Sequence, residues 1–136
     1  MIVNPSYMYL KKSEPPAPED IFRANQVNYQ YQGTAQLYSD GFYFRSMQDL
    51  KFTGVDCSRR TKIDISGYTS AIGQSTSFKV TIDSGSQTSV TISIPPNGTH
   101  SRSVEIPEKH RTKNVSITFS TEYISGTLIL TSATLV

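Results

Sequence analysis

The sequence has only one cysteine and no apolar run long enough to span a bilayer. Because a single thiol cannot form an internal disulfide, the fold must rest on packing alone, which suits assembly in a reducing cytoplasm. Charge of one sign is also scarce, since the 136 residues carry a formal net charge of +2. That value excludes the dense positive field that nucleic-acid binding requires. We therefore expect no nucleic-acid partner and no membrane partner.

Signals for export and for metal binding are missing as well. The apolar start of the chain is interrupted by Asn4 and Pro5, and Lys11 and Lys12 follow the apolar residues instead of preceding them. This order is the reverse of a secretory leader, so we expect no secretion signal. No spacing of His, Cys, Asp or Glu matches a zinc pattern, so we expect no metal site and no cofactor.

The carboxylates lie singly along the chain, mostly at turns or at outward strand positions. A hydrolase needs two carboxylates, or a nucleophile with a base, in one pocket. His100 and His110 lie far from Cys57 in sequence, and a small semi-buried residue is the favoured interpretation of this cysteine. We predict that the protein is not an enzyme and that its carboxylates are solvated, namely Asp40, Asp49, Asp56, Asp64, Asp83, Glu105, Glu108 and Glu122.

What the sequence does contain, from Leu37 onward, is apolar and polar residues in alternation, the pattern of a half-buried strand. Roughly eight such runs are separated by turn residues, and no room is left for helical crossovers. The pattern predicts an all-β, jelly-roll-like antiparallel β-sandwich over residues 37–136. Its expected inner residues are Phe52, Ile65, Phe78, Val80, Ile82, Val90, Ile92, Ile117, Phe119, Leu128 and Leu130.

Residues 1–36 read as an extended N-terminal arm with a proline-containing linker. A polyproline-type spacer follows the apolar start, and residues 19–25 have the composition of one short helical turn. An apolar tip held away from its own domain would be sticky unless another subunit covers it. We therefore predict partner contacts, in a homo- or hetero-oligomer, for Ile2, Val3, Tyr7, Met8, Tyr9 and Leu10.

Tyrosines are the most interesting residues of the predicted sandwich. Tyr43 should point outward because Phe42 and Phe44 flank it, and Tyr68 and Tyr123 fall in expected loops. Exposed tyrosines suit stacking on a sugar ring or a protein interface, but they also suit simple covering of the sandwich edges. Both interpretations stay open for these three tyrosines, and Asn97 in a Pro–Gly loop joins them as a candidate glycan or partner contact.

Three segments carry a resemblance to known domains. They are Phe78–Gly85, Ile94–His100, and the pair Val115–Phe119 with Leu128–Ser132. The region resembles a jelly roll of the carbohydrate-binding-module and galactose-binding-like type, which implies recognition of a cell-surface polysaccharide. The absence of tryptophan excludes the tryptophan platform that sugar-binding members commonly present. No dense acidic cluster is present to hold the structural calcium ion of some members.

The arm, the compact sandwich and the lone cysteine together resemble a small virion protein of a tailed bacteriophage. This resemblance implies a non-enzymatic head-decoration, neck or baseplate component, located in the virion and assembled in the host cytoplasm. Its partners would be capsid, neck or tail proteins, with host-surface glycan as a further contact. The alternative is a carbohydrate-binding module recognising a cell-surface polysaccharide.

Replacing Phe119 with Ala tests the predicted sandwich. If the ring lies between two packed sheets, the substitution should lower the free energy of unfolding by about 3–5 kcal/mol. Chemical denaturation monitored by circular dichroism measures the change. A negligible effect, or a spectrum dominated by helix, would contradict the β-sandwich.

Overall fold

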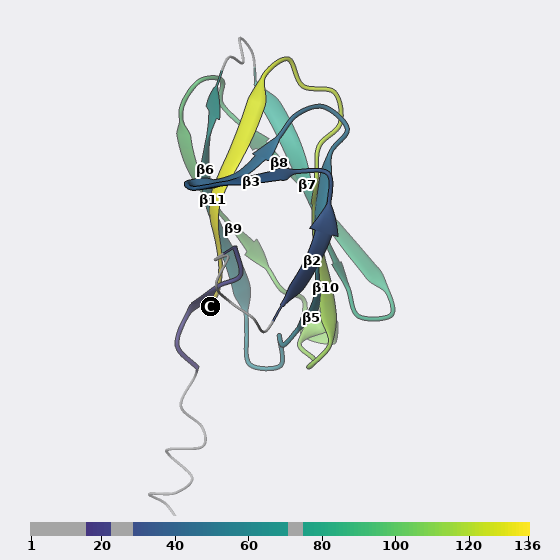
Figure 1. Ribbon diagram of the computed structural model, residues 1–136. Helices are drawn as coiled ribbons and strands as arrows, with labels where there is room; N and C mark the ends of the chain where they lie inside the picture. Colours follow the sequence, from purple (N-terminus) through teal and green to yellow (C-terminus); the bar gives the residue numbers. More distant parts are fainter. Residues whose placement is uncertain (1–15, 23–28, 71–74) are drawn as a thin grey trace, which may run out of the picture.

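The computed structural model describes residues 16–22, 29–70 and 75–136, and they form two antiparallel sheets packed face to face (Figure 1). The first sheet has the order β3-β4-β11-β6-β9, with β1 added to β11, and the second has the order β2-β5-β10-β7-β8. The strands are β1 Glu19–Asp20, β2 Gln30–Gly33, β3 Gln36–Tyr38, β4 Gly41–Phe44, β5 Asp49–Val55, β6 Lys62–Ser70, β7 Thr76–Asp83, β8 Gln87–Ile94, β9 Thr99–Glu105, β10 Val115–Ser120 and β11 Thr127–Leu135. The predicted all-β sandwich is confirmed, and within the described ranges no helix is long and apolar enough to cross a membrane.

The core lies between the sheets and is built from the alternating residues of both. Phe119 is fully buried, and its ring packs edge-on against Phe22 and Phe52. The residues predicted to be inside are buried, with the exception of Val90, which is 37% exposed. β8 is an edge strand of the second sheet, so its side chains are covered from one side only, and alternation alone does not bury Val90.

The N-terminal region is more deeply integrated than the sequence suggests. Glu19 and Asp20 pair with β11 instead of starting a helical turn, and Ile21 and Phe22 are buried. Packing drives this arrangement, because the Phe22 ring stacks on Phe52 at a centroid distance of 5.5 Å. The sandwich therefore includes β1 and β2, which precede Leu37, and β3, which begins at Gln36. The predicted contact residues Ile2, Val3, Tyr7, Met8, Tyr9 and Leu10 lie outside the described residues.

Arg60 fastens this N-terminal segment to the sandwich. Its guanidinium donates to the carbonyls of Ala17 (2.8 Å) and Leu135 (3.3 Å), and lies 3.4 Å from the Glu19 carboxylate. Tyr29 donates its hydroxyl to the same carboxylate at 2.9 Å. Because Arg60 is buried, removing the Glu19 carboxylate would leave its positive charge without an ion-pair partner, at a cost in stability. The base of the arm is thus tied to the end of β11.

Both histidines are buried, and they differ in the hydrogen bonds made by their ring nitrogens. His110, in the short 3-10 helix Glu108–His110, shares hydrogen bonds with Ser84 (2.7 Å) and Thr88 (2.8 Å). His100 projects inward from β9 near Phe78, and neither ring nitrogen has a hydrogen-bond partner. Burial, and secondarily the charge of Arg102, lowers the pKa of His100, so the ring stays neutral in the folded protein.

The lone thiol of Cys57 is fully buried. Burial is the main cause that raises its pKa to about 12, and the neighbouring Asp56 carboxylate adds to the shift. Because the thiolate is the nucleophilic form, Cys57 is an inert packing residue at neutral pH. The predicted packing role of this small side chain is confirmed, and Cys57 is fully buried instead of semi-buried as expected.

The buried His100 predicts acid sensitivity. Because the folded state lowers the pKa of this imidazole, the unfolded chain binds the extra proton first, and stability should fall as the pH drops below about 6.5. Replacing His100 with Leu should flatten the dependence of the unfolding free energy on pH between about 7 and 5. The slope that remains is assigned to His110, whose pKa is also lowered by burial. An unchanged slope in His100→Leu would contradict this assignment.

Candidate functional site

The outer face of the first sheet carries a row of directly opposed residues. Tyr43 of β4 and Tyr68 of β6 are both paired with Ile129 of the central strand β11. The row continues to Gln36 on β3 and to Thr99 on β9. Opposed residues of an antiparallel sheet point to the same face, so the row brings two tyrosines from distant parts of the sequence onto one surface.

The outward direction of Tyr43 is confirmed, because its neighbours Phe42 and Phe44 are buried in the core. The predicted loop position of Tyr68 is wrong, since this residue lies inside β6. Ser66 and Gly67, a Ser–Gly pair of the kind that favours turns, also lie within β6. A Cβ on Gly67 would lie 2.1 Å from the carbonyl oxygen of Ile129, so glycine marks a close approach of two strands here.

Asp40 joins the two tyrosines at their hydroxyl ends. Tyr68 donates to its carboxylate at 2.6 Å and Tyr43 at 3.0 Å, and the two hydroxyl oxygens lie 3.4 Å apart. The hydrogen bond from Tyr68 is the main cause that lowers the pKa of Asp40, and the bond to Asp40 in turn raises the pKa of Tyr68. At neutral pH Asp40 is therefore an anion, and both hydroxyl protons are committed to it. The tyrosine oxygens remain free to accept hydrogen bonds from a ligand.

Ile129 explains why the two rings stay in place. It is buried although it lies on the outer face of the first sheet, where the core residues do not cover it. Its direct cross-strand neighbours are Tyr43 and Tyr68. Apolar contact with Ile129 below and the hydrogen bonds to Asp40 at the tips hold the rings from two sides. The surface is thus preorganised.

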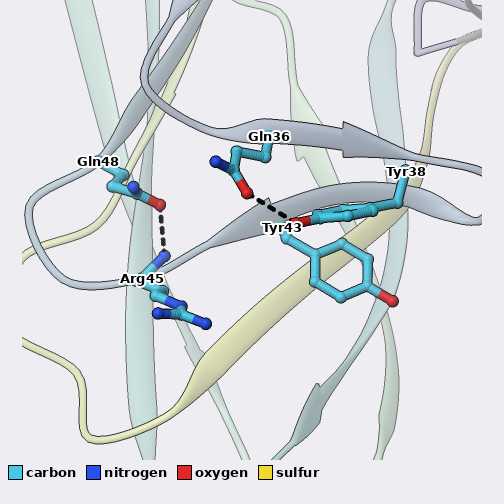
Figure 2. A pocket seen from close by; sticks show the side chains of 5 residues that line it. All are labelled: Gln36, Tyr38, Tyr43, Arg45 and Gln48. Carbon is cyan, nitrogen blue, oxygen red and sulfur yellow. Dashed lines mark hydrogen bonds between the residues drawn. The ribbon is translucent and has the colours of Figure 1, made fainter.

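A shallow pocket adjoins this cluster, and Figure 2 shows its lining residues, Gln36, Tyr38, Tyr43, Arg45 and Gln48. The rings of Tyr38 and Tyr43 lie 4.5 Å apart, and Tyr38 is 51% exposed. The volume of about 180 Å³ is below that of typical enclosed ligand sites, roughly 300–1,000 Å³. The geometry therefore suits contact with part of a larger ligand that lies along the surface.

The other two predicted contact residues lie near the site but not in its lining. Asn97 is in the turn between β8 and β9, where Gly98 exchanges hydrogen bonds with Thr69, the residue after Tyr68. Tyr123 is 82% exposed in the loop between β10 and β11. That loop is hydrogen-bonded to Ser46 and Met47, next to Arg45. Roles for Asn97 and Tyr123 in binding stay predictions.

Sequence reasoning missed Gln36, Tyr38, Arg45 and Gln48. Gln36 and Tyr38 could have been predicted from a β-hairpin over residues 36–44. Asp40-Gly41 is a strong turn signal, and the residues on either side of such a turn pair with each other. Arg45 and Gln48 come from an irregular segment held by the backbone hydrogen bond from Arg45 to the Gln48 side chain at 2.7 Å. No periodicity marks such a segment.

Other carboxylates of the described residues are engaged by their neighbours. Asp64 accepts a hydrogen bond from Ser103, and Asp83 from Gly85 and Gln87. Over residues 16–22, 29–70 and 75–136, no group of three or more His, Cys, Asp or Glu side chains is placed to hold a metal ion.

Comparison with known proteins places the fold. No protein-family model and no curated protein matches the chain. The family 11 carbohydrate-binding module from Clostridium thermocellum, solved with a β-1,3-1,4-mixed-linked tetrasaccharide, is 13% identical at a TM-score of 0.55, over 88% of this chain and 95% of that one. This likeness shows that the two chains share the jelly-roll type of β-sandwich.

Two further solved structures match less closely. TmCBM61, solved in complex with β-1,4-galactotriose, is 8% identical at a TM-score of 0.49, over 93% of this chain and 92% of that one. The K2 cleaved adhesin domain of Lys-gingipain is 15% identical at a TM-score of 0.49, over 91% of each chain.

Replacing Asp40 with Ala tests the tyrosine cluster. Loss of the acceptor should lower the pKa of Tyr68 toward the ordinary tyrosine value of about 10. Spectrophotometric titration of tyrosinate measures the shift. Asp64→Ala is the matched control, because it removes an exposed carboxylate from the strand of Tyr68 without touching a tyrosine. Identical titration curves for Asp40→Ala and the parent would show that Asp40 does not hold the cluster.

Proposed function

We propose that this protein is a saccharide-binding domain without catalytic activity, and that a glycan lies on the outer face of the first sheet. The observation that carries the proposal is the preorganised cluster of Tyr43, Asp40 and Tyr68, with the exposed ring of Tyr38 beside it. The glycan would contact these rings and continue along the sheet. Cell-surface polysaccharide is the class of ligand we propose.

The chemistry of the face matches the two-sided chemistry of sugars. A pyranose ring has apolar C–H faces, which stack on aromatic rings, and a rim of hydroxyls, which donate and accept hydrogen bonds. Asp40 and the tyrosine oxygens supply acceptors. Beyond Tyr68, the outward positions of β6 and β9 supply hydroxyls, since Ser66 is paired with Ser101 and Tyr68 with Thr99. A surface with small polar groups around fixed aromatic rings suits an extended chain of sugars.

The shared fold also supports the proposal of saccharide binding. The family 11 module was solved with a tetrasaccharide bound, so a sandwich of this type is able to bind a glycan. At 13% identity this support extends to the architecture, and the tyrosine cluster must carry the rest of the proposal.

A place in a bacteriophage particle, with capsid, neck or tail proteins as partners, stays a prediction from the sequence. It is compatible with glycan binding, because a virion accessory protein can carry a domain that contacts the host surface. The predicted arm contacts fall outside the described residues, and Arg60 marks where that arm would leave the sandwich.

Substitutions of Tyr43 test the proposed surface. Tyr43→Ala removes a ring and one contact to Asp40, and should weaken binding of the recognised glycan roughly tenfold or more. Tyr43→Phe keeps the ring and should weaken binding less. A glycan array identifies the ligand, and isothermal titration calorimetry measures the dissociation constants.

Tyr123→Ala is the comparison for these variants, since it removes an exposed tyrosine that lies outside the pocket lining. Equal losses for Tyr43→Ala and Tyr123→Ala would move the binding surface to the loops at the end of the sandwich. Absence of binding to any glycan on a broad array would refute the proposed function.

A further inference from the structure

The pocket beside the tyrosine cluster offers hydrogen-bond donors and few acceptors. The backbone N–H of Arg45 can only donate, so the Gln48 side-chain atom that it contacts must be the carbonyl oxygen. The Gln48 Nε2 group therefore keeps its donors. Gln36 is used in the same way, because its carbonyl oxygen accepts from the Tyr38 hydroxyl at 2.7 Å. In both side-chain amides the carbonyl oxygen is bonded to the protein, and the NH2 group is left to donate to a ligand (Figure 2).

Arg45 adds a full positive charge to these donors. Its guanidinium has no hydrogen bond and no ion pair to any of the residues that the structure describes. By contrast, the buried Arg60 has three partners for its guanidinium. An arginine side chain that lines a pocket without a protein partner is available for a ligand anion.

The lining of the pocket carries no negative charge of its own. None of the five lining residues is acidic. Within residues 16–22, 29–70 and 75–136, the carboxylate that hydrogen-bonds to a lining side chain is that of Asp40, which contacts the Tyr43 hydroxyl and lies in the cluster with Tyr68. The surface is thus polarised, with acceptors at Asp40 and donors at Arg45. A ligand would place neutral hydroxyls at the first and an anionic group at the second.

We propose that the saccharide recognised here is acidic, and that the carboxylate of a uronic acid residue binds the Arg45 guanidinium. The inference rests on the proposed glycan-binding function and specifies its ligand class. The planar guanidinium fork matches the two oxygens of a carboxylate, and Gln36 and Gln48 are placed to donate further hydrogen bonds. The rings of Tyr38 and Tyr43 contact the same sugar or its neighbour.

The test compares two ligands with the same sugar backbone, one with free carboxylates and one with these groups neutralised as methyl esters. An oligogalacturonate and its full methyl ester, of equal length, are titrated calorimetrically into the intact protein. We expect the acid to bind at least about tenfold more tightly than the ester, as a charge-assisted contact requires. Arg45→Gln should bring the ratio of the two dissociation constants close to one. Arg45→Lys should restore part of the ratio, because it keeps the charge and loses the fork.

Lys51→Gln is the matched control, because it removes one positive charge from β5 of the second sheet, away from the pocket. In Lys51→Gln, the ratio of the dissociation constants for the acid and the ester should equal the ratio in the parent. Equal binding of acid and ester by the parent, or a ratio that survives in Arg45→Gln, would overturn the acidic ligand and leave glycan binding intact. An equal loss of the ratio in Lys51→Gln would reduce the preference to general attraction and overturn the role of Arg45.

Two further outcomes are decisive. A sulfated oligosaccharide that binds the parent more tightly than the uronate, with the same dependence on Arg45, would overturn the carboxylate as the recognised group. Failure of the acid, the ester and a broad set of neutral oligosaccharides to bind would overturn this inference together with the proposed function. Thermal unfolding of each variant verifies folding, and Arg45→Gln should unfold like the parent because its side chain is exposed.

Discussion

The backbone of β11 lies so close to its two neighbours that a side chain cannot fit between them at two positions. A Cβ on Gly41 would lie 2.3 Å from the Leu130 carbonyl oxygen, and one on Gly67 would lie 2.1 Å from that of Ile129. These glycines let β4 and β6 approach β11 from opposite sides, which fixes the register at Ile129. The register in turn decides that both tyrosines of the cluster flank the same residue. A slip of one residue on either strand would send one ring into the core.

Alternation predicted best the strands that bury every second residue. From Phe78 to Ile82 in β7, and throughout β10, the apolar residues are buried and the polar residues between them are less buried, a pattern that the sequence contains. In β6 this pattern ends at Ile65, because the buried residues Gly67 and Thr69 are not apolar side chains. The short strands were missed because they lack it. β2 is exposed along its whole length, and β1 has two residues, so neither contains a period. Their positions depend on pairing with β5 and β11, which are remote in sequence.

The candidate site shows the same limit. The outward direction of Tyr43 follows from its two buried neighbours, and the sequence contains all three residues side by side. Tyr43 and Tyr68 come together because both are paired with Ile129 of β11, the last strand of the chain. No short segment of the sequence indicates this pairing. The donor character of the pocket depends on which atoms of Gln36 and Gln48 are already bonded. That information exists only after the chain is folded.

The attachment of the N-terminal segment has a mechanical consequence. β1 is hydrogen-bonded to β11 at Thr134 and Leu135, and Arg60 binds Ala17 and the same end of β11 together. Tension on the chain before Ala17 therefore enters the strand on which Ile129 and the two tyrosine neighbours are assembled. A pull on the arm would therefore load the central strand of the first sheet, which also supports the tyrosine cluster.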